Sequence, residues 1–567
     1  MSIPRPEHPN PQFERDSWEN LNGIWEFEID KSASGADREF YKREKLNDEI
    51  LVPFCPESKL SGIGNTDFLN SVWYKRNINI KDKSKRIILH IGACDYFTTV
   101  YVNERIAGTH KGGYTPIVID ITEFVKMGEN SLVVHALDNG RDGRQPRGKQ
   151  SPGYYSAGCD YTRTTGIWQT VWLEYVPNAY IKSVKYYPDA KNGKIRISAD
   201  VAGEGEFTVS AYYEGREVGK ASAKSHGGMA EVTVDLSEIH LWEVGVGRLY
   251  DLKLSFNEDE VSSYFGLRDC YLDGYRFMIN GKSVFQRTVL DQGYYPEGIY
   301  TAPDEADLVK DIQLSLDAGF NGARLHQKVF EPRFLYNCDK MGYIVWGEYA
   351  NWGLDHTAYE SLPTMLREWE EAVERDFNHP AIIGWCPFNE TWDLNGKRQI
   401  DEILEMVYRA TKAMDCTRPC IDTSGAYHVI TDVFDFHDYD QNVENFKTRF
   451  DKLMTENVLL EHNTKKDGVQ YNGEPVFASE YGGIKWDETD EECWGYGEAP
   501  RTKEEFVERY KGLTEALLNN NRIFGFCYTQ LYDIEQERNG LYTYSREPKF
   551  DMEIFRKINT QPEAIEK

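Results

Sequence analysis

Two carboxylates at the ends of apolar segments could carry acid–base chemistry. Glu390 follows Asn389 at the end of the apolar run IIGWCPFNE, and Glu480 ends a second apolar run, PVFASE. Because Asp and Glu are rarely buried without partners, Glu390 has two interpretations. It is either a capping residue of the following loop, or a carboxylic acid in a dry site whose raised pKa lets it donate a proton.

Together the two carboxylates could cleave a glycosidic bond. One carboxyl group protonates the leaving oxygen while the other attacks the anomeric carbon. A retaining mechanism requires carboxyl groups roughly 5–5.5 Å apart. Taken alone, Glu480 also fits a helix-start residue before the turn at Gly482 and Gly483. The hypothesis therefore depends on a fold that brings both side chains to one place.

Residues 267–567 have the alternating pattern of an α/β fold, in which apolar strand-like runs alternate with helical patterns. Eight such units over about 300 residues predict a (β/α)8 TIM barrel. The strand candidates are SVFQRTVLD, GFNGARLH, GYIVWGEY, AIIGWCPFNE, RPCIDTS, DVFDFHDY, EPVFASE and RIFGFCYTQ. Polar residues end many of them: Asp291, His326, Glu348, Glu390, His437, Glu480 and Gln530. Since barrel active sites lie at the carboxyl ends of the strands, Glu390 and Glu480 are predicted to face one mouth from strands four and seven.

The preceding residues read as two β-rich domains. Short alternating runs rich in Val, Ile, Tyr and Trp up to residue 177 predict a β-sandwich of jelly-roll type. Further short strands over residues 178–266 have the length of an immunoglobulin-like sandwich. The predicted domains are therefore 1–177, 178–266 and 267–567.

Composition excludes several classes of function. The 567 residues carry a net charge of −28, which disfavours nucleic acid and anionic membranes as partners. No window approaches the roughly 18 apolar residues of a membrane span. The ten cysteines are scattered without a Cys-x-x-Cys pair, which indicates buried thiols in a reducing compartment. We therefore expect a cytoplasmic protein, unless a signal peptide has been trimmed from this sequence.

Several longer motifs resemble glycoside hydrolase family two, which includes β-galactosidases, β-glucuronidases and β-mannosidases. They include FERDSWENLNGIWEFEID, GACDYFTTVYVNERIAGTHKGGYTP, DYTRTTGIWQTVWLE, YFGLRD, RDFNHPAIIGWCPFNE and ASEYGG, in that order. The likeness covers essentially the whole length and is strongest to β-galactosidase-like members with three domains. It implies the same order of jelly roll, immunoglobulin-like sandwich and barrel. It also implies Glu390 as the acid/base and Glu480 as the nucleophile.

The resemblance implies further substrate-binding residues in the third domain and in the first. Asn389 is expected to hydrogen-bond the sugar 2-hydroxyl, a contact that strengthens in the transition state. Asp160, in CDYTRTTGIW, matches a first-domain aspartate that reaches over the barrel to the sugar hydroxyls. A turn residue is the alternative for Asp160.

Four more positions match groups around the sugar and the nucleophile. Arg324 in NGARLH matches an arginine that orients the nucleophile. His326 lies one residue out of register with a substrate-binding histidine of the family, which leaves its role open. His437 and Tyr439 end the sixth strand candidate, where the family places groups beside the sugar and the nucleophile. A structural histidine is the alternative for His437.

The segment IEQERNGLYTYSREPK bears on the sugar. It resembles the loop in which β-glucuronidases carry an Asn-x-Lys pair that holds the substrate carboxylate, but here the positions are Glu537 and Asn539. A charge-assisted hydrogen bond from Lys is worth about 1.5–3 kcal/mol, whereas a glutamate repels a uronate. We therefore expect a retaining exo-β-glycosidase of neutral sugars, β-galactosides first, acting through a covalent glycosyl-enzyme. Activity as a β-mannosidase, β-glucuronidase or α-L-arabinofuranosidase stays open.

No cofactor is expected, and the magnesium ligands of larger family β-galactosidases have no match here. The expected partner is a small-molecule glycoside or oligosaccharide, and homo-oligomerisation stays open. A non-catalytic carbohydrate-binding protein is the alternative from another class. Only an enzyme needs two strand-end carboxylates, and this sequence retains both.

Overall fold

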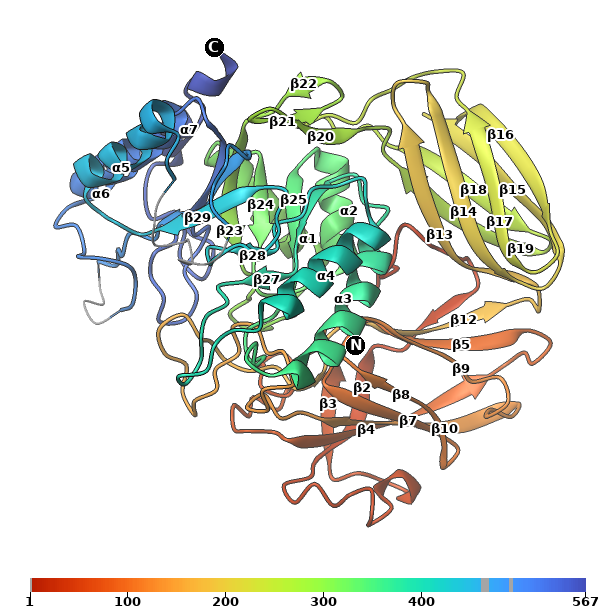
Figure 1. The fold of residues 1–567 in the computed structure, drawn as a ribbon. Helices are drawn as coiled ribbons and strands as arrows, with labels where there is room; N and C mark the ends of the chain where they lie inside the picture. Colours follow the sequence, from red (N-terminus) through yellow and green to blue (C-terminus); the bar gives the residue numbers. More distant parts are fainter. Residues whose placement is uncertain (1–2, 460–468, 489–492) are drawn as a thin grey trace.

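The computed structural model describes residues 3–459, 469–488 and 493–567. Figure 1 shows two β-rich domains beside a third domain of mixed strands and helices, with the first domain below and the second to the right. Each of the three has a buried core of its own. Among the described helices, none is long and apolar enough to cross a membrane.

The first domain is a β-sandwich. One sheet has four strands in the order β1-β12-β5-β9, the other six in the order β3-β2-β4-β10-β7-β8, and β11 pairs with β6. The strands are β1 (Trp18–Asn20), β2 (Gly23–Ile29), β3 (Asp48–Val52), β4 (Ser71–Ile80), β5 (Arg86–Ile91), β6 (Cys94–Asp95), β7 (Phe97–Val102), β8 (Arg105–Lys111), β9 (Ile117–Asp120), β10 (Gly128–Leu137), β11 (Gly166–Ile167) and β12 (Val171–Val176). The long loop from β10 to β11 carries Asp160.

The second domain is a smaller antiparallel sandwich. Its sheets run β13-β14-β17 and β16-β15-β18-β19. The strands are β13 (Tyr180–Asp189), β14 (Lys194–Ala202), β15 (Gly205–Tyr213), β16 (Arg216–Ser225), β17 (Gly228–Asp235), β18 (Tyr250–Phe256) and β19 (Asp259–Phe265). Buried and exposed residues alternate along β17 and β18, as expected for strands with one face on a core. The small sheet of β20 (Cys270–Asp273), β21 (Arg276–Ile279) and β22 (Lys282–Ser283) follows.

The third domain is built on parallel strands. Seven form one curled sheet in the order β26-β25-β24-β23-β31-β30-β29. They are β23 (Gln286–Asp291), β24 (Gly322–Leu325), β25 (Ile344–Glu348), β26 (Ile382–Cys386), β29 (Phe434–Asp438), β30 (Val476–Gly482) and β31 (Ile523–Thr529). Every residue of β26, β29, β30 and β31 is buried, which is typical of parallel strands covered on both faces.

The fifth strand candidate, RPCIDTS, forms only the two-residue β28 (Thr423–Ser424). It pairs with β27 (Phe388–Asn389) and lies outside the seven-stranded sheet. Its preceding Asp422 uses both carboxylate oxygens locally, accepting from His428 and from the backbone of Val429 and Ile430. The Thr423 N–H also donates to Asp422 Oδ1 at 2.8 Å, so a donor of β28 is used by a side chain and is lost to strand pairing.

Seven helices accompany these strands. They are α1 (Glu305–Asp317), α2 (Pro332–Met341), α3 (Leu362–Asp376), α4 (Asp401–Met414), α5 (Val443–Glu456), α6 (Lys503–Leu518) and α7 (Met552–Asn559) among the described residues. Local sequence fixes several starts: Asp304 and Asp307 form a capping box on α1, and Thr502 caps α6. Strands alternate with helices and run parallel, so the carboxyl ends of the strands, and therefore the predicted site, lie at one end of the sheet (Figure 1).

Hydrogen bonds join the outer domains to the third. The backbone N–H of Tyr114 donates to Glu368 Oε1 of α3 at 2.7 Å, and Thr301 Oγ1 donates to the Trp168 carbonyl at 2.6 Å. From the second domain, the Tyr264 hydroxyl donates to Asp339 Oδ2 at 2.8 Å. These contacts hold the first and second domains against the third.

Candidate active site

Two glutamates meet at the carboxyl ends of opposite strands. Glu390 follows β27, and Glu480 lies within β30, close to its end. A carboxylate oxygen of each, and a ring nitrogen of His437, lie within 4.8 Å of one another. The separation that the glycosidic hypothesis requires is therefore present in this structure.

Glu480 is held as a buried carboxylate. Arg324 Nη1 donates to its Oε1 at 2.7 Å, and the Tyr439 hydroxyl donates to its Oε2. Burial alone would raise the pKa of Glu480, but the charges of His437, Arg324 and His326 lower it overall, well below its usual range. An ionised carboxylate with fixed donors is the form that a nucleophile needs.

Glu390 is the more accessible of the pair. Its side chain is 22% exposed, against 4% for Glu480, so it can exchange protons with a leaving group and with water. The residue has the left-handed backbone conformation, with φ of 47°, and its N–H donates to the Ser424 carbonyl at 2.9 Å. Such a conformation is uncommon outside glycine and clusters at active sites.

His437 connects the two carboxylates. Its Nδ1 lies 2.7 Å from Glu390 Oε1, and its Nε2 lies 3.4 Å from Glu480 Oε1. Burial lowers the pKa of His437, but the negative charges of Glu480 and Glu390 raise it overall. The histidine therefore responds to any change of charge on either glutamate.

Asn389 presents an unsatisfied donor beside Glu390. Its Oδ1 accepts from Arg324 Nη2 at 2.5 Å, and its backbone N–H donates to Asn351 Oδ1 at 2.8 Å. Its Nδ2 is buried and has no hydrogen-bond partner among the residues that the structure describes. A buried donor without a partner is costly, which favours a ligand oxygen at this position.

Glu348 anchors the arginine from behind. It accepts from Arg324 Nε at 2.7 Å, and its other oxygen lies 2.7 Å from His326 Nδ1. Burial raises the pKa of Glu348, and the positive charge of Arg324 opposes that shift. His326 thus hydrogen-bonds Glu348, and its charge also acts on Glu480.

Asp160 lies in the first-domain loop that docks on the third domain. Its carboxylate accepts from Arg147 Nη1 at 3.0 Å and is one-quarter exposed. Gln536 Nε2 donates to the Asp160 carbonyl at 2.9 Å and to the Gly158 carbonyl at 2.7 Å. The loop therefore borders the same segment as Glu537.

Sequence reasoning missed several residues that support the site: Glu348, Asn351, Ser424 and Asp435. The sequence did point to Glu348, because it is one of the polar residues that end a strand candidate. The Ser424 hydroxyl donates to Asp435 Oδ2 at 2.6 Å and lies 3.0 Å from His437 Nε2. No motif indicated that relay.

Glu390, His437 and Glu480 are also the described residues whose ligand atoms could surround a metal ion. The Arg324 guanidinium on Glu480 places a fixed positive charge where a divalent cation would bind. These side chains therefore fit acid–base chemistry better than metal coordination.

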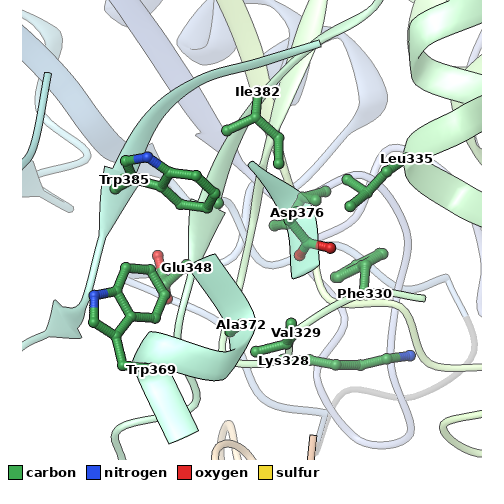
Figure 2. A pocket seen from close by; sticks show the side chains of 12 residues that line it. Lys328, Val329, Phe330, Leu335, Glu348, Trp369, Ala372, Asp376, Ile382 and Trp385 are labelled. Atoms are coloured by element: carbon green, nitrogen blue, oxygen red, sulfur yellow. The ribbon is translucent and has the colours of Figure 1, made fainter. Parts of the chain in front are cut away.

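A separate cavity of about 10 Å³ lies between α3 and the neighbouring strands. Trp369 and Trp385 lie on one side of it, and Leu335 and Phe330 on the other (Figure 2). Since one water molecule needs about 10–15 Å³, this space is a packing gap that no sugar could enter.

Comparison with known proteins identifies the family. Three descriptions of glycosyl hydrolases family 2 match in order: the sugar binding domain over residues 62–177, the family's middle domain over 179–268, and the TIM barrel domain over 271–561. The barrel match alone covers more than half of the 567 residues. The chain belongs to glycosyl hydrolase family 2. The family resemblance and the three-part fold predicted from sequence are thereby confirmed.

Relatives of this family 2 chain carry two different names. A β-glucuronidase of Sus scrofa is 26% identical over 455 residues, covering 72% of this chain and 68% of the relative. A β-galactosidase of Thermoanaerobacter pseudethanolicus is 26% identical over 462 residues, covering 75% of this chain and 57% of the relative.

Solved structures share the whole fold of the family 2 chain. A β-glucuronidase from an uncultured Clostridium species superposes with a TM-score of 0.80 at 20% identity, covering 97% of this chain and 99% of that one. The β-glucuronidase of Ruminococcus gnavus gives 0.80 at 18% identity, covering 97% and 98%. At these identities the likeness establishes the fold.

Proposed function

We propose that this family 2 glycoside hydrolase is a retaining exo-β-glycosidase. The observation that carries the proposal is the approach of Glu390 and Glu480 within 4.8 Å around His437. This separation suits a carboxylate that attacks the sugar directly, since an inverting pair leaves room for water at about 6.5–9.5 Å.

The reaction proceeds in two displacements. Glu480 attacks the anomeric carbon as the glycosidic C–O bond breaks, and Glu390 gives its proton to the departing oxygen. Arg324 and Tyr439 orient the Glu480 carboxylate through their hydrogen bonds. In the second step, Glu390 takes a proton from water, the water oxygen bonds the anomeric carbon, and Glu480 leaves as a carboxylate. The proposed role of Asn389 is to donate from its unpaired Nδ2 to the sugar 2-hydroxyl oxygen.

A neutral glycon is the proposed substrate, with β-galactosides first. Glu537 is 2% exposed, and its carboxylate accepts from the Tyr161 hydroxyl and from Asn539 Nδ2 at 2.8 Å. The negative charges of Glu537 and Glu480 act on each other. The carboxylate of a glucuronate bound in this site would be repelled by the negative charge of Glu537.

β-Glucuronidase activity is the second candidate, because several related proteins carry that name. Hydrolysis of nitrophenyl galactoside, glucoside, mannoside, xyloside, arabinoside and glucuronide decides between them. Galactoside turnover exceeding that of glucuronide supports the proposal, and the reverse order supports the second candidate. Sugar binding without turnover of any member would indicate a binding protein and refute the enzyme.

The charge state of Glu480 predicts a bell-shaped pH profile with its acidic limb at low pH. Because the pKa of Glu480 is depressed, the nucleophile stays ionised as the pH falls below the ordinary glutamate value of 4.5. On the alkaline side, activity falls when Glu390 loses the proton that it must donate. We expect kcat/KM, measured from about pH 3 to about pH 10, to retain activity below 4.5. An acidic limb above that value, in protein shown by circular dichroism to remain folded, would contradict the assignment.

A further inference from the structure

Lys149 is a buried cation without an acceptor. It lies in the loop between β10 and β11, is 5% exposed, and places Nζ 3.9 Å from the centre of the Trp352 ring. Across the part of the chain that the structure describes, no group accepts a hydrogen bond from its ammonium and no carboxylate forms an ion pair with it. Lysine is almost never fully buried unless it is paired, and its three N–H donors favour oxygen acceptors.

Lys328 provides an internal contrast. It is also buried, at 4% exposed, but its Nζ donates to the Gly293 carbonyl at 2.5 Å and to the Tyr300 carbonyl at 2.8 Å. These two acceptors give Lys328 a role in holding the fold. Lys149 lacks such acceptors, so packing alone does not explain a charge at this position.

The backbone around Lys149 is fixed against the strand ends. Arg147 N–H donates to the Trp352 carbonyl at 2.8 Å, and the Lys149 carbonyl accepts from Tyr161 N–H at 2.7 Å. Gly148 has φ of +56°, and a Cβ at this position would lie 2.2 Å from the Gln327 carbonyl oxygen. The loop can approach this closely only with glycine, so the ammonium is held in place by a preformed backbone.

Two series of contacts place Lys149 near the paired glutamates. Its ammonium lies over Trp352, whose neighbour Asn351 hydrogen-bonds the backbone of Asn389. Its carbonyl accepts from Tyr161, whose hydroxyl donates to Glu537. Burial lowers the pKa of Lys149, but the groups of Cys159, Glu537, Glu390 and Glu480 raise it overall. The ammonium therefore lies in the field of the paired glutamates and of Glu537 without touching any of them.

We propose that Lys149 is a substrate-binding residue that donates hydrogen bonds to ring hydroxyl oxygens of the glycon, opposite Glu537, which accepts a hydrogen bond from a ring hydroxyl. The inference rests on the proposed glycosidase function and names a specificity determinant within it. Glu537 retains acceptor capacity beyond its bonds from Tyr161 and Asn539. A cation and an anion together match the donor and acceptor of neutral hydroxyls, and they do not favour a net negative glycon.

The test replaces Lys149 by methionine, which keeps an unbranched apolar chain and removes the charge. Binding of galactose, glucose, mannose, xylose, arabinose and glucuronate to the full chain is measured by calorimetry, together with the KM for the best glycoside. We expect sugar affinity to fall about 10- to 100-fold. Circular dichroism should show that the variant remains folded, so that the loss of affinity reports the missing donor.

Lys111→Met is the matched control. Lys111 belongs to the same domain, is exposed, and contacts Thr364 Oγ1 at 3.1 Å. The Lys111→Met variant should bind every sugar with the affinity of the wild type. Lys149→Met affinity within about two-fold of the wild type, or a loss shared with Lys111→Met, would overturn the proposal.

Glu537→Gln tests the other half of the pair. With the anion removed, glucuronate affinity should rise relative to galactose, and an unchanged ratio would overturn the pairing. Binding that depends on Lys149 without turnover of any glycoside would refute the glycosidase and leave the sugar site standing. Glycoside turnover that is unchanged in Lys149→Met would support the glycosidase and refute the Lys149 site. A wild-type protein that binds no sugar of the set would also refute the Lys149 site.

Discussion

Glu480→Ala is expected to lower kcat/KM on an activated aryl glycoside by about four to six orders of magnitude, because no other group can form the covalent intermediate. Folding should persist, since Arg324 keeps its ion pair with Glu348 when Glu480 is lost. Measurement of turnover and of Tm on the same preparation separates the two effects. Near-normal turnover would refute the nucleophile role.

A small nucleophile sharpens this test. Azide can enter the space that the alanine variant leaves and attack the anomeric carbon from that face. The product should then be a glycosyl azide of inverted configuration, identified by NMR. Restored turnover with a product of retained configuration would place the nucleophile elsewhere. Glu402→Ala, an exposed residue of α4, is the matched control and should behave as the wild type does.

Glu390→Ala is expected to separate substrates by their leaving groups. A poor leaving group needs the proton, so its kcat/KM should fall by about 10²–10⁴-fold, whereas a nitrophenolate leaves without help and should lose much less. The measurement is a series of aryl glycosides of rising phenol pKa, for which the dependence on leaving-group pKa should become steeper in the variant.

The azide response distinguishes Glu390 from Glu480. In Glu390→Ala the covalent intermediate still forms from an activated substrate, so azide should attack it and give a glycosyl azide of retained configuration. An equal loss for good and poor leaving groups, or an inverted azide product, would contradict the acid/base role. Glu402→Ala again provides the unaffected comparison.

The strand ends were predictable from sequence because their chemistry follows from periodicity. Apolar runs ending in Glu390, Glu480 and His437 indicate parallel strands, and parallel strands bring their carboxyl ends to one edge. The fold around them was predictable for the same reason. The short length of β28 was less predictable from sequence, because it depends on local hydrogen bonds of the Asp422 carboxylate.

Residues supplied by loops could not be found in this way. Lys149 stands in no alternating pattern, and its position follows from the close approach of Gly148 to Gln327. Asn351 acts through a pair of hydrogen bonds with the backbone of Asn389, which no spacing rule anticipates. Contacts between distant segments depend on three-dimensional docking that a one-dimensional pattern does not encode.

The hydrogen bond from Tyr114 to Glu368 bears on the evolution of the architecture. Glu368 is fully buried, burial raises its pKa to about 7, and one of its two oxygens takes its donor from outside the domain that contains it. An ancestral module excised with this glutamate would carry an orphaned acceptor in its interior. Recombination of these domains into a new order would therefore require compensating substitutions at the interface between the first and third domains.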